Sequence, residues 1–360
     1  MLVVFIVYKN IDLLNIGNPC NQNCRQCFYT EEDDSNLEEE IELVEAIIKD
    51  NPKTKIFVYP KEITTNMSLL KYLKKTEQKS VMTNGKALTE EQIIEFRKYS
   101  IEDVWFTMFA DAEEQEFWNG NSEEQYARIK KSIKLARLYG LRTNVFTIVA
   151  PQNISKLEKL CTEMKERGVE KIELRRILPV GNAKDIDDKY LIREDDLAEL
   201  ITVVDSLKNE KSPRIYFSLA FGPDFYGNSV WKYLRGEIKS DWVATRTLCP
   251  TVNNNYLGIS TKTGKRYWCF MLLSDDMNEG SYDFSEEALK ENLRSICSKD
   301  NCEFQEYCLG GCRSYAYIFA KLRGEAKPEY AGMDICRTDI RRKKFLNKQT
   351  QSRLTWHSKE

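Results

Sequence analysis

The sequence predicts an α/β protein built on a parallel sheet. Short runs rich in β-branched and aromatic residues alternate with helix-start signals from residue 11 to residue 180. Three helix starts, at residues 89, 122 and 155, have the even spacing of one strand, one helix and two short loops, and the segments share no repeated motif. Such alternation indicates right-handed β–α–β crossovers, so we expect the active-site loops at the carboxyl ends of parallel strands.

The strands are expected where short apolar runs are bounded by turn residues. These runs are residues 11–16, 55–59, 80–82, 103–109, 141–149 and 171–177. The opening run, residues 2–8, also resembles a strand. It is too short to span a membrane, and it has neither a basic region before it nor a small-residue cleavage site after it, so we exclude a signal peptide and a membrane span.

The helices are expected to begin at capping boxes, in which a hydroxyl N-cap precedes a Glu or Gln by three residues. The pairs are Ser35 with Glu38, Thr89 with Gln92, Ser122 with Gln125, and Ser155 with Glu158. In the third helix, apolar residues recur at helical spacing and define its buried face: Tyr126, Ile129, Ile133 and Ala136. One more helix is expected over residues 193–208, and a domain change near residue 240.

Composition and charge exclude several classes of protein. The 360 residues are enough for about two domains. With 54 basic and 56 acidic side chains the net charge is −2, which argues against binding nucleic acid through bulk positive charge. The sequence contains 11 cysteines and no recognisable secretory signal. A cytoplasmic protein that uses its cysteines for metal or redox chemistry is therefore favoured over a disulfide framework.

The first cysteine cluster is Cys20-Asn-Gln-Asn-Cys24-Arg-Gln-Cys27, a CxxxCxxC loop directly after an expected strand. Zinc would need a fourth Cys or His nearby, and the single histidine is His357. A cubane iron–sulfur cluster suits three cysteines better than zinc or a disulfide, because its fourth iron can stay open to a substrate or cofactor.

This motif resembles that of the radical SAM superfamily, whose CxxxCxxC follows the first strand of a partial (β/α)6 barrel. The resemblance implies a TIM-like partial barrel over residues 1–240 and a [4Fe-4S] cluster on Cys20, Cys24 and Cys27. It also implies that the open iron binds S-adenosyl-L-methionine (AdoMet), which one-electron reduction cleaves to a 5′-deoxyadenosyl radical. In such cofactor enzymes the protein supplies orientation and shielding.

The same resemblance implies the cofactor contacts. It assigns AdoMet binding to Glu62, Phe28, Thr107 and Asn144. Two positions differ from the family pattern: its Gly-Gly-Glu reads Pro60-Lys61-Glu62, and its aromatic residue before the third cysteine is Gln26. Glu62 is expected to accept a hydrogen bond from the AdoMet ammonium.

A second group of seven cysteines lies in residues 249–336. It resembles the SPASM extension of peptide-modifying radical SAM enzymes, which implies a small domain over residues 241–345 with a β-hairpin and helices around two auxiliary [4Fe-4S] clusters, followed by a tail over 346–360. The alternative is a pair of zinc ribbons. The resemblance implies Cys249, Cys269 and Cys312 for one cluster, and Cys297, Cys302, Cys308 and Cys336 for the other.

The auxiliary cluster with three cysteines would lack a fourth thiolate. An open iron or a non-cysteine ligand, one of residues 253–255 or Asp275, is therefore implied. Residues 256–268, with a turn at Lys262-Thr-Gly264, are expected to form a hairpin that brings Cys269 back toward Cys249. The remaining cysteine, Cys161, shares its helical spacing with apolar neighbours and is expected to be a buried structural thiol.

The leading functional hypothesis is an oxidoreductase that modifies a peptide or protein by radical chemistry: a crosslink, a thioether, an epimerisation or an oxidation, as in peptide maturation. A flavodoxin- or ferredoxin-type electron donor is implied. One alternative is a radical SAM/SPASM enzyme acting on a small molecule such as a haem precursor. An alternative of another class is an iron–sulfur electron-transfer protein, which would not cleave AdoMet.

Overall fold

The computed structural model describes residues 9–17, 20–29, 36–192, 213–217, 256–267, 269 and 312–322, with six helical positions between 196 and 207. Those six positions agree with the helix expected over 193–208. The expected strand at residues 2–8, the boundary near 240 and the tail over 346–360 lie outside the described residues. So do Cys249, Cys297, Cys302, Cys308 and Cys336.

Parallel strands form the open barrel that the sequence predicts. They are β1 (Asn10–Ile16), β2 (Lys55–Pro60), β3 (Ser80–Thr83), β4 (Asp103–Thr107), β5 (Arg142–Val149), β6 (Lys171–Arg176) and β7 (Arg214–Phe217). The order β3-β4-β5-β6-β7 is continuous, and β2 pairs with β1 in a second sheet. All six expected strands are therefore confirmed. The sequence did not predict β7, which pairs in parallel with β6.

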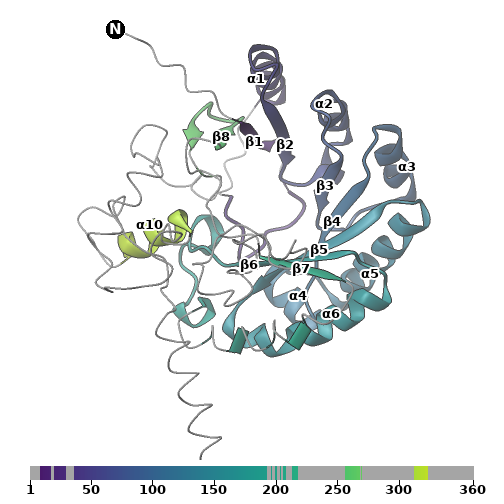
Figure 1. Cartoon of the computed structure of the whole chain (residues 1–360), viewed down its shortest axis with the longest axis vertical. Helices are drawn as coiled ribbons and strands as arrows, with labels where there is room; N and C mark the ends of the chain where they lie inside the picture. Colours follow the sequence, from purple (N-terminus) through teal and green to yellow (C-terminus); the bar gives the residue numbers. More distant parts are fainter. Residues whose placement is uncertain are drawn as a thin grey trace, which may run out of the picture.

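Helices cover the outer face of the strand arc (Figure 1). They are α1 (Leu37–Asp50), α2 (Leu70–Lys75), α3 (Glu90–Lys98), α4 (Ala112–Asn119), α5 (Glu123–Leu138) and α6 (Leu157–Glu166), with α10 (Arg313–Leu322) beyond the barrel. Short 3-10 turns join them: η1 (Ile63–Thr65), η2 (Met67–Leu69), η3 (Pro151–Lys156), η4 (Gly181–Ala183) and η5 (Asp188–Tyr190). No helix in this described part of the chain is both long and apolar enough to cross a membrane.

Two of the four expected helix starts have the predicted capping box, at Thr89 and Ser122. The other two expectations were wrong. The N-cap of α1 is Asn36, the residue after the expected Ser35. The Asn36 side chain accepts from Glu38 N, and its Nδ2 donates to Glu39 Oε1 at 3.3 Å. Ahead of α6, a 3-10 turn starts at a proline and extends the chain past Ser155, so α6 begins at Leu157 without a side-chain cap.

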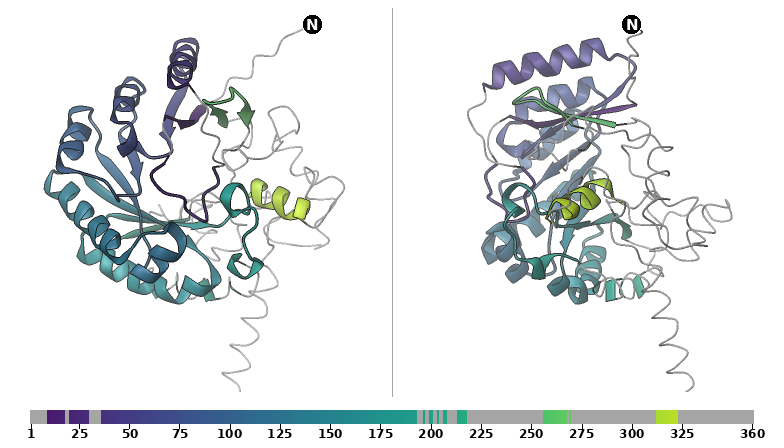
Figure 2. Two further views of the ribbon diagram at one scale, coloured as in Figure 1. Left: turned by 180° about the vertical axis from the view of Figure 1, so that it is seen from behind. Right: turned by 90° about the vertical axis from the view of Figure 1, so that its left-hand side faces the viewer.

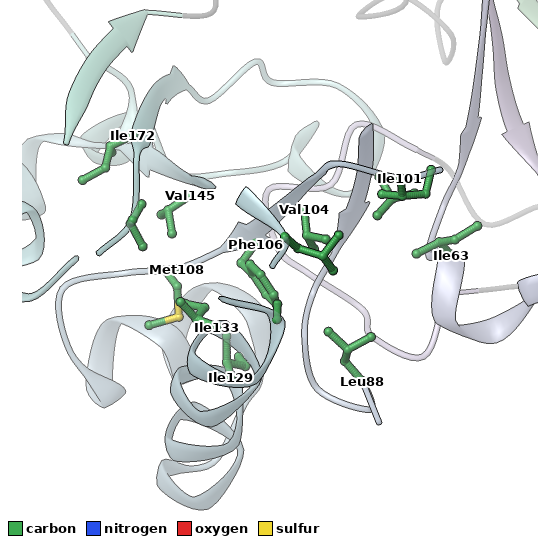
Figure 3. Close-up of a cluster of buried hydrophobic side chains, with 14 of the residues drawn as sticks. Ile63, Leu88, Ile101, Val104, Phe106, Met108, Ile129, Ile133, Val145 and Ile172 are labelled. Carbon is green, nitrogen blue, oxygen red and sulfur yellow. The ribbon is translucent and has the colours of Figure 1, made fainter. Parts of the chain in front are cut away.

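The main core lies between the strands and the outer helices. Phe106 of β4, the adjacent Met108, and Ile129 and Ile133 of α5 have no exposed surface and point toward one another (Figure 3). Burial of such side chains contributes about 1.5–3 kcal/mol each. The expected buried face of α5 is confirmed, and Cys161 is confirmed as a buried thiol within the same core.

The side chain of Gln78 joins β2 to β3, which share no strand ladder. Its Oε1 accepts from Val58 N at 2.7 Å, and its Nε2 donates to Val58 O at 3.2 Å and to Ser80 O at 3.0 Å. The amide is buried, and it provides partners for strand groups that would otherwise have none.

The expected hairpin is confirmed as β8 (Tyr256–Ser260) and β9 (Arg266–Tyr267), with Gly264 at φ +67° in its turn. The resemblance assigns this hairpin to the C-terminal domain over residues 241–345, and the structure pairs it with the first strand of the barrel. β8 pairs in parallel with β1, from Asn10 opposite Tyr256 to Leu14 opposite Ser260. The hairpin therefore extends the sheet that carries the first strand of the barrel (Figure 2).

Candidate functional site

The CxxxCxxC loop lies at the carboxyl end of β1, where the sequence places it. Cys20, Cys24 and Cys27 are partly buried, and none forms a disulfide. The loop is reached through Gly17, whose φ of +92° favours glycine and whose N–H donates to the buried Glu40 of α1 at 3.0 Å. The motif is therefore anchored to the barrel before its first cysteine.

Amide pairs hold the loop to the barrel, and each joins one motif side chain to an asparagine of a barrel loop. The four motif side chains Asn21, Gln22, Asn23 and Gln26 bond Asn84, Asn121, Asn182 and Asn119, at 2.6, 2.6, 2.7 and 2.6 Å respectively. Asn84 follows β3, Asn119 and Asn121 lie at and just after the end of α4, and Asn182 lies in η4 after β6. Three separate segments therefore fix the positions of the cysteines.

Arg25, the remaining residue inside the motif, also contacts the end of α4. Its backbone N donates to Trp118 O at 2.9 Å, and its guanidinium lies 4.6 Å from the centre of the Phe117 ring. Every residue between the cysteines thus has a partner on the barrel.

Backbone contacts from η4 fix the third cysteine. Asn182 N donates to Cys27 O at 2.8 Å. Gly181, at φ +59°, approaches so closely that a Cβ there would lie 2.5 Å from the carbonyl carbon of Phe28 and 2.6 Å from Cys27 O. Only glycine satisfies both the left-handed conformation and this contact.

Glu62 is buried beside the loop and accepts a dense set of hydrogen bonds. Its Oε1 accepts from Thr83 Oγ1 at 2.6 Å and from Thr64 Oγ1 at 2.8 Å and Thr64 N at 3.1 Å, and its Oε2 accepts from Asn84 N at 2.7 Å. Burial raises the pKa of Glu62, although these hydrogen bonds oppose the rise. Asn84 also directs its side chain toward Cys20, with Nδ2 to Sγ at 3.8 Å, and so links carboxylate and cysteine loop.

The electrostatics of the loop favour a cationic occupant. Burial raises the pKa of Cys20 to about 11, and the charges of Glu62 and Cys27 add to the rise. Burial and the same neighbours raise the pKa of Cys24 as well. Three thiolates and a carboxylate in one partly buried site would need a compensating positive charge, which a bound metal centre could supply.

A cluster and a single metal ion require different spacings of their ligands. Ligands 2.3 Å from one tetrahedral zinc stand about 3.8 Å apart, whereas a cubane binds each thiolate on a different iron and sets them farther apart. Within the described residues, no three His, Cys, Asp or Glu side chains converge as ligands of one ion. The donor set of the loop is three thiolates, which a cubane cluster with one open iron could use.

Thr107 and Phe28 lie at this end of the barrel, and their contact with AdoMet stays a prediction. Thr107 ends β4 and is buried, and Phe28 follows Cys27 with its ring 4.4 Å from that of Tyr29. Thr107 pairs in register with Phe146, and Phe146 with Glu173, so the three side chains share one row on the barrel sheet.

Asn144 is not brought to this group. It lies near the start of β5, and its Nδ2 donates to Asp103 at the start of β4 at 3.1 Å. Val149 ends the same strand, five residues and about 16 Å farther along. Because the cysteine loop is at the carboxyl edge, Asn144 is at the opposite edge of the sheet.

Two of the seven C-terminal cysteines are described, and the structure brings them together. Cys269 follows β9 and Cys312 precedes α10, and both are buried. Ser314, two residues after Cys312, donates to Cys269 Sγ with an oxygen-to-sulfur distance of 2.9 Å. The implied assignment of both cysteines to one auxiliary cluster stays a prediction.

The sequence analysis missed the asparagines that hold the cysteine loop. Asn84, Asn119, Asn121 and Asn182 come from segments up to 159 residues away from their partners, so their pairing is invisible in local patterns. One signal was present: four of the five residues between the cysteines are amides, which require polar partners when they are buried.

The fold is similar to those of solved enzymes, although no protein-family model and no curated protein sequence matches the chain. Streptococcus suis SuiB bound to its precursor peptide SuiA has 17% sequence identity and a TM-score of 0.63, over 92% of this chain and 76% of that chain. SuiB bound to S-adenosylmethionine has 16% identity and a TM-score of 0.59, over 91% of this chain and 77% of that chain.

A third similar structure is anSMEcpe with bound AdoMet and a Cp18Cys peptide, with 16% identity and a TM-score of 0.60, over 85% of this chain and 89% of that chain. SuiB and anSMEcpe are radical SAM/SPASM enzymes. At these identities the likeness is one of fold. The chain thus has the α/β fold of these solved structures, and the expected fold class, an α/β protein with a partial TIM-like barrel, is confirmed.

Proposed function

We propose that the chain is a radical SAM enzyme that binds AdoMet at a [4Fe-4S] cluster on Cys20, Cys24 and Cys27 and modifies a peptide or protein substrate. The observation that carries this proposal is the cysteine loop itself, held by four amide pairs at the carboxyl edge of the barrel with the buried Glu62 beside it. When bound, the cluster and AdoMet supply one electron and a 5′-deoxyadenosyl radical.

In this proposal the residues of the chain bind the cluster and AdoMet, orient them and shield them from solvent. The three thiolates hold the cluster and leave its fourth iron for AdoMet. Glu62, already linked to the loop through Asn84, is placed to accept from the AdoMet ammonium. Thr107 and Phe28 lie at the same edge and complete the proposed contacts. We leave Asn144 out of this set because it lies at the other edge of the sheet.

The barrel sheet offers a polar surface for substrate. Glu173 and Arg175 of β6 alternate with the buried Ile172 and Leu174, which belong to the main core, so the two charged side chains lie on the other face. Arg175 bonds Glu173 at 2.9 Å, and its guanidinium lies 4.2 Å from the centre of the Phe146 ring. Such a pair suits a peptide, which presents both donors and acceptors.

Peptide ligands in the solved relatives favour a peptide over a haem precursor, since SuiB is bound to the precursor peptide SuiA and anSMEcpe to a Cp18Cys peptide. A flavodoxin- or ferredoxin-type protein is proposed as the electron donor. Two auxiliary clusters, on the cysteines named above, complete the proposal.

The test is AdoMet cleavage by anaerobically reconstituted protein with dithionite. We expect about 12 iron per chain if all three sites hold cubanes, and 5′-deoxyadenosine as product. Replacing Cys20, Cys24 and Cys27 together by alanine should remove roughly one third of the iron and all deoxyadenosine formation. Cys161→Ala is the matched control and should keep both, because that thiol is buried in the core.

Other outcomes select the alternatives. Zinc with negligible iron would refute the proposal, and iron without deoxyadenosine in the wild-type protein would favour an electron-transfer protein. Parallel incubations with a short peptide encoded beside the gene and with a haem precursor distinguish a peptide-modifying enzyme from one that acts on a small molecule. The true substrate, when deuterated, should transfer deuterium to 5′-deoxyadenosine.

A further inference from the structure

Ser314 follows Cys312 by two residues and contacts Cys269, the other described C-terminal cysteine. Cys269 and Cys312 keep 8% and 4% of their surface exposed, and Ser314 none. The Ser314 hydroxyl donates to Cys269 Sγ across 45 residues of sequence, with a distance of 2.9 Å. A buried hydroxyl directed at a buried sulfur needs an explanation, because ordinary packing at this position would be served by alanine.

The barrel fixes the orientation of this hydroxyl. Tyr315, the next residue, donates from its OH to Ile177 O, just after β6. The guanidinium of the buried Arg176 lies 3.8 Å from the centre of the Tyr315 ring. These contacts hold the first turn of α10 against the end of β6, where Figure 2 draws the helix in yellow. Ser314 is thus placed by a rigid element.

The distance distinguishes a hydrogen-bond donor from a metal ligand. Two ligands of one tetrahedral metal stand about 3.8 Å apart, and ligands on different irons of a cubane stand farther apart. The separation of 2.9 Å is shorter than either, and it agrees with a hydrogen bond from the hydroxyl to the sulfur. We therefore treat the Ser314 hydroxyl as a donor to Cys269.

The N-terminus of α10 also stabilises negative charge on a cysteine sulfur. Ala316 N donates to Cys312 O, so Cys312 is at the helix N-terminus, where the partial positive charge of the backbone stabilises a thiolate. One cysteine is thus stabilised by the helix and the other by the serine. Both features favour the more negative state of a cluster that these sulfurs hold.

We infer that Ser314 is a positioning residue for the auxiliary cluster on Cys269 and Cys312, and that its hydrogen bond to the Cys269 sulfur raises the reduction potential of that cluster. Hydrogen bonds to ligand sulfurs are an established means by which proteins tune iron–sulfur potentials. On one-electron reduction by the external donor, the hydroxyl keeps its proton and the bond to the more negative sulfur strengthens. This inference rests on the proposed function, which supplies the cluster.

The experiment is a potentiometric titration with dithionite, followed by electron paramagnetic resonance. It uses reconstituted protein in which Cys20, Cys24 and Cys27 are replaced by alanine, so that only auxiliary clusters contribute signals. In Ser314→Ala, one cluster should become about tenfold harder to reduce at a given potential, which is 59 mV for a one-electron couple, and the other should stay unchanged. Ser314→Thr keeps the hydroxyl and should behave as the parent does.

The matched control is Ser132→Ala, which removes another buried serine hydroxyl, bonded to Gly85 O, and should shift neither cluster. Potentials unchanged in Ser314→Ala, or shifted alike in the Ala and Thr variants, would overturn the inference. If Ser314→Ala does not assemble the cluster, assembly in Ser314→Thr supports the hydroxyl, and failure in both overturns it. A parent protein without iron would instead refute the auxiliary clusters and, with them, that part of the proposed function.

Discussion

Replacing Gly181 by alanine should remove the cluster from the first cysteine loop and leave the rest of the fold in place. The residue has φ +59°, which costs alanine about 1–2 kcal/mol. The new Cβ would also lie 2.5 Å from the Phe28 carbonyl carbon, where ordinary contact begins at 3.4 Å, so the backbone must move by roughly 0.9 Å (3.4 − 2.5). Overpacking of this kind costs about 1–3 kcal/mol.

The two costs together are about 2–5 kcal/mol, and moving the segment of Cys27 and Phe28 is the direct way to relieve the clash. The third thiolate would then be displaced from the other two. We therefore expect Gly181→Ala to lose roughly one third of the iron and all 5′-deoxyadenosine formation, measured by iron analysis and by chromatography of the products.

Gly140→Ala is the control that separates the effect of backbone strain from the effect of a steric clash of the new Cβ. Gly140 has φ +73° but nothing within 4 Å of its Cβ position, and it precedes β5 at the amino edge of the barrel. This variant should lose about 1–2 kcal/mol of stability and keep its iron and its activity. Equal iron content and equal deoxyadenosine yield in Gly181→Ala and wild type would refute the reasoning.

Three further predictions concern binding, stability and pH. Glu62→Gln should weaken AdoMet binding by roughly 10- to 100-fold without loss of iron, because a charge-assisted contact is lost; unchanged affinity in anaerobic calorimetry would exclude that contact. Gln78→Leu should lower the free energy of unfolding by about 2–4 kcal/mol in urea, because Val58 N–H and C=O lose their partner; a loss below about 0.5 kcal/mol would contradict this. Burial raises the pKa of Asp103, but hydrogen bonds, with Arg142 the largest, outweigh it and lower the pKa below 3.8. The stability gained in this way is present above that value and is lost as the pH falls through the lower, folded-state pKa. The unfolding free energy of Arg142→Gln should therefore fall less steeply below about pH 4 than that of wild type. Parallel pH profiles of the two proteins would contradict the pairing of Asp103 with Arg142.

The strands and their carboxyl-edge loop were predictable because their signals are local. Alternation and apolar runs located six strands, and cysteine spacing alone located the loop after β1. The helix starts were predictable where one capping residue dominates, as at Thr89. Before α1 the sequence offers two adjacent capping residues, Ser35 and Asn36, and local pattern does not choose between them; the structure has Asn36 as the N-cap.

The parts that could not be predicted depend on contacts between distant segments. Nothing near Gln78 indicates that its side chain will join two strands, and nothing near Asn182 indicates that it will bond the cysteine loop. Asn144 shows the converse limit: a resemblance placed it at the cofactor, but strand register places it at the other edge of the sheet. The position of a residue along its strand decides whether its side chain lies at the amino or the carboxyl edge of the sheet.

Because β8 pairs with β1, one side of β1 can be completed only late in folding. Leu14 and Thr261 bond each other across 247 residues, so β1 stays an unpaired edge on that side until the chain has been synthesised past residue 260. Contacts of such sequence separation slow folding and leave apolar strands exposed to aggregation. A nascent or shortened chain that ends near residue 240 would therefore present β1 as an open strand edge directly beside the cysteine loop, so expression of the barrel alone is expected to give aggregation-prone protein that assembles its cluster poorly.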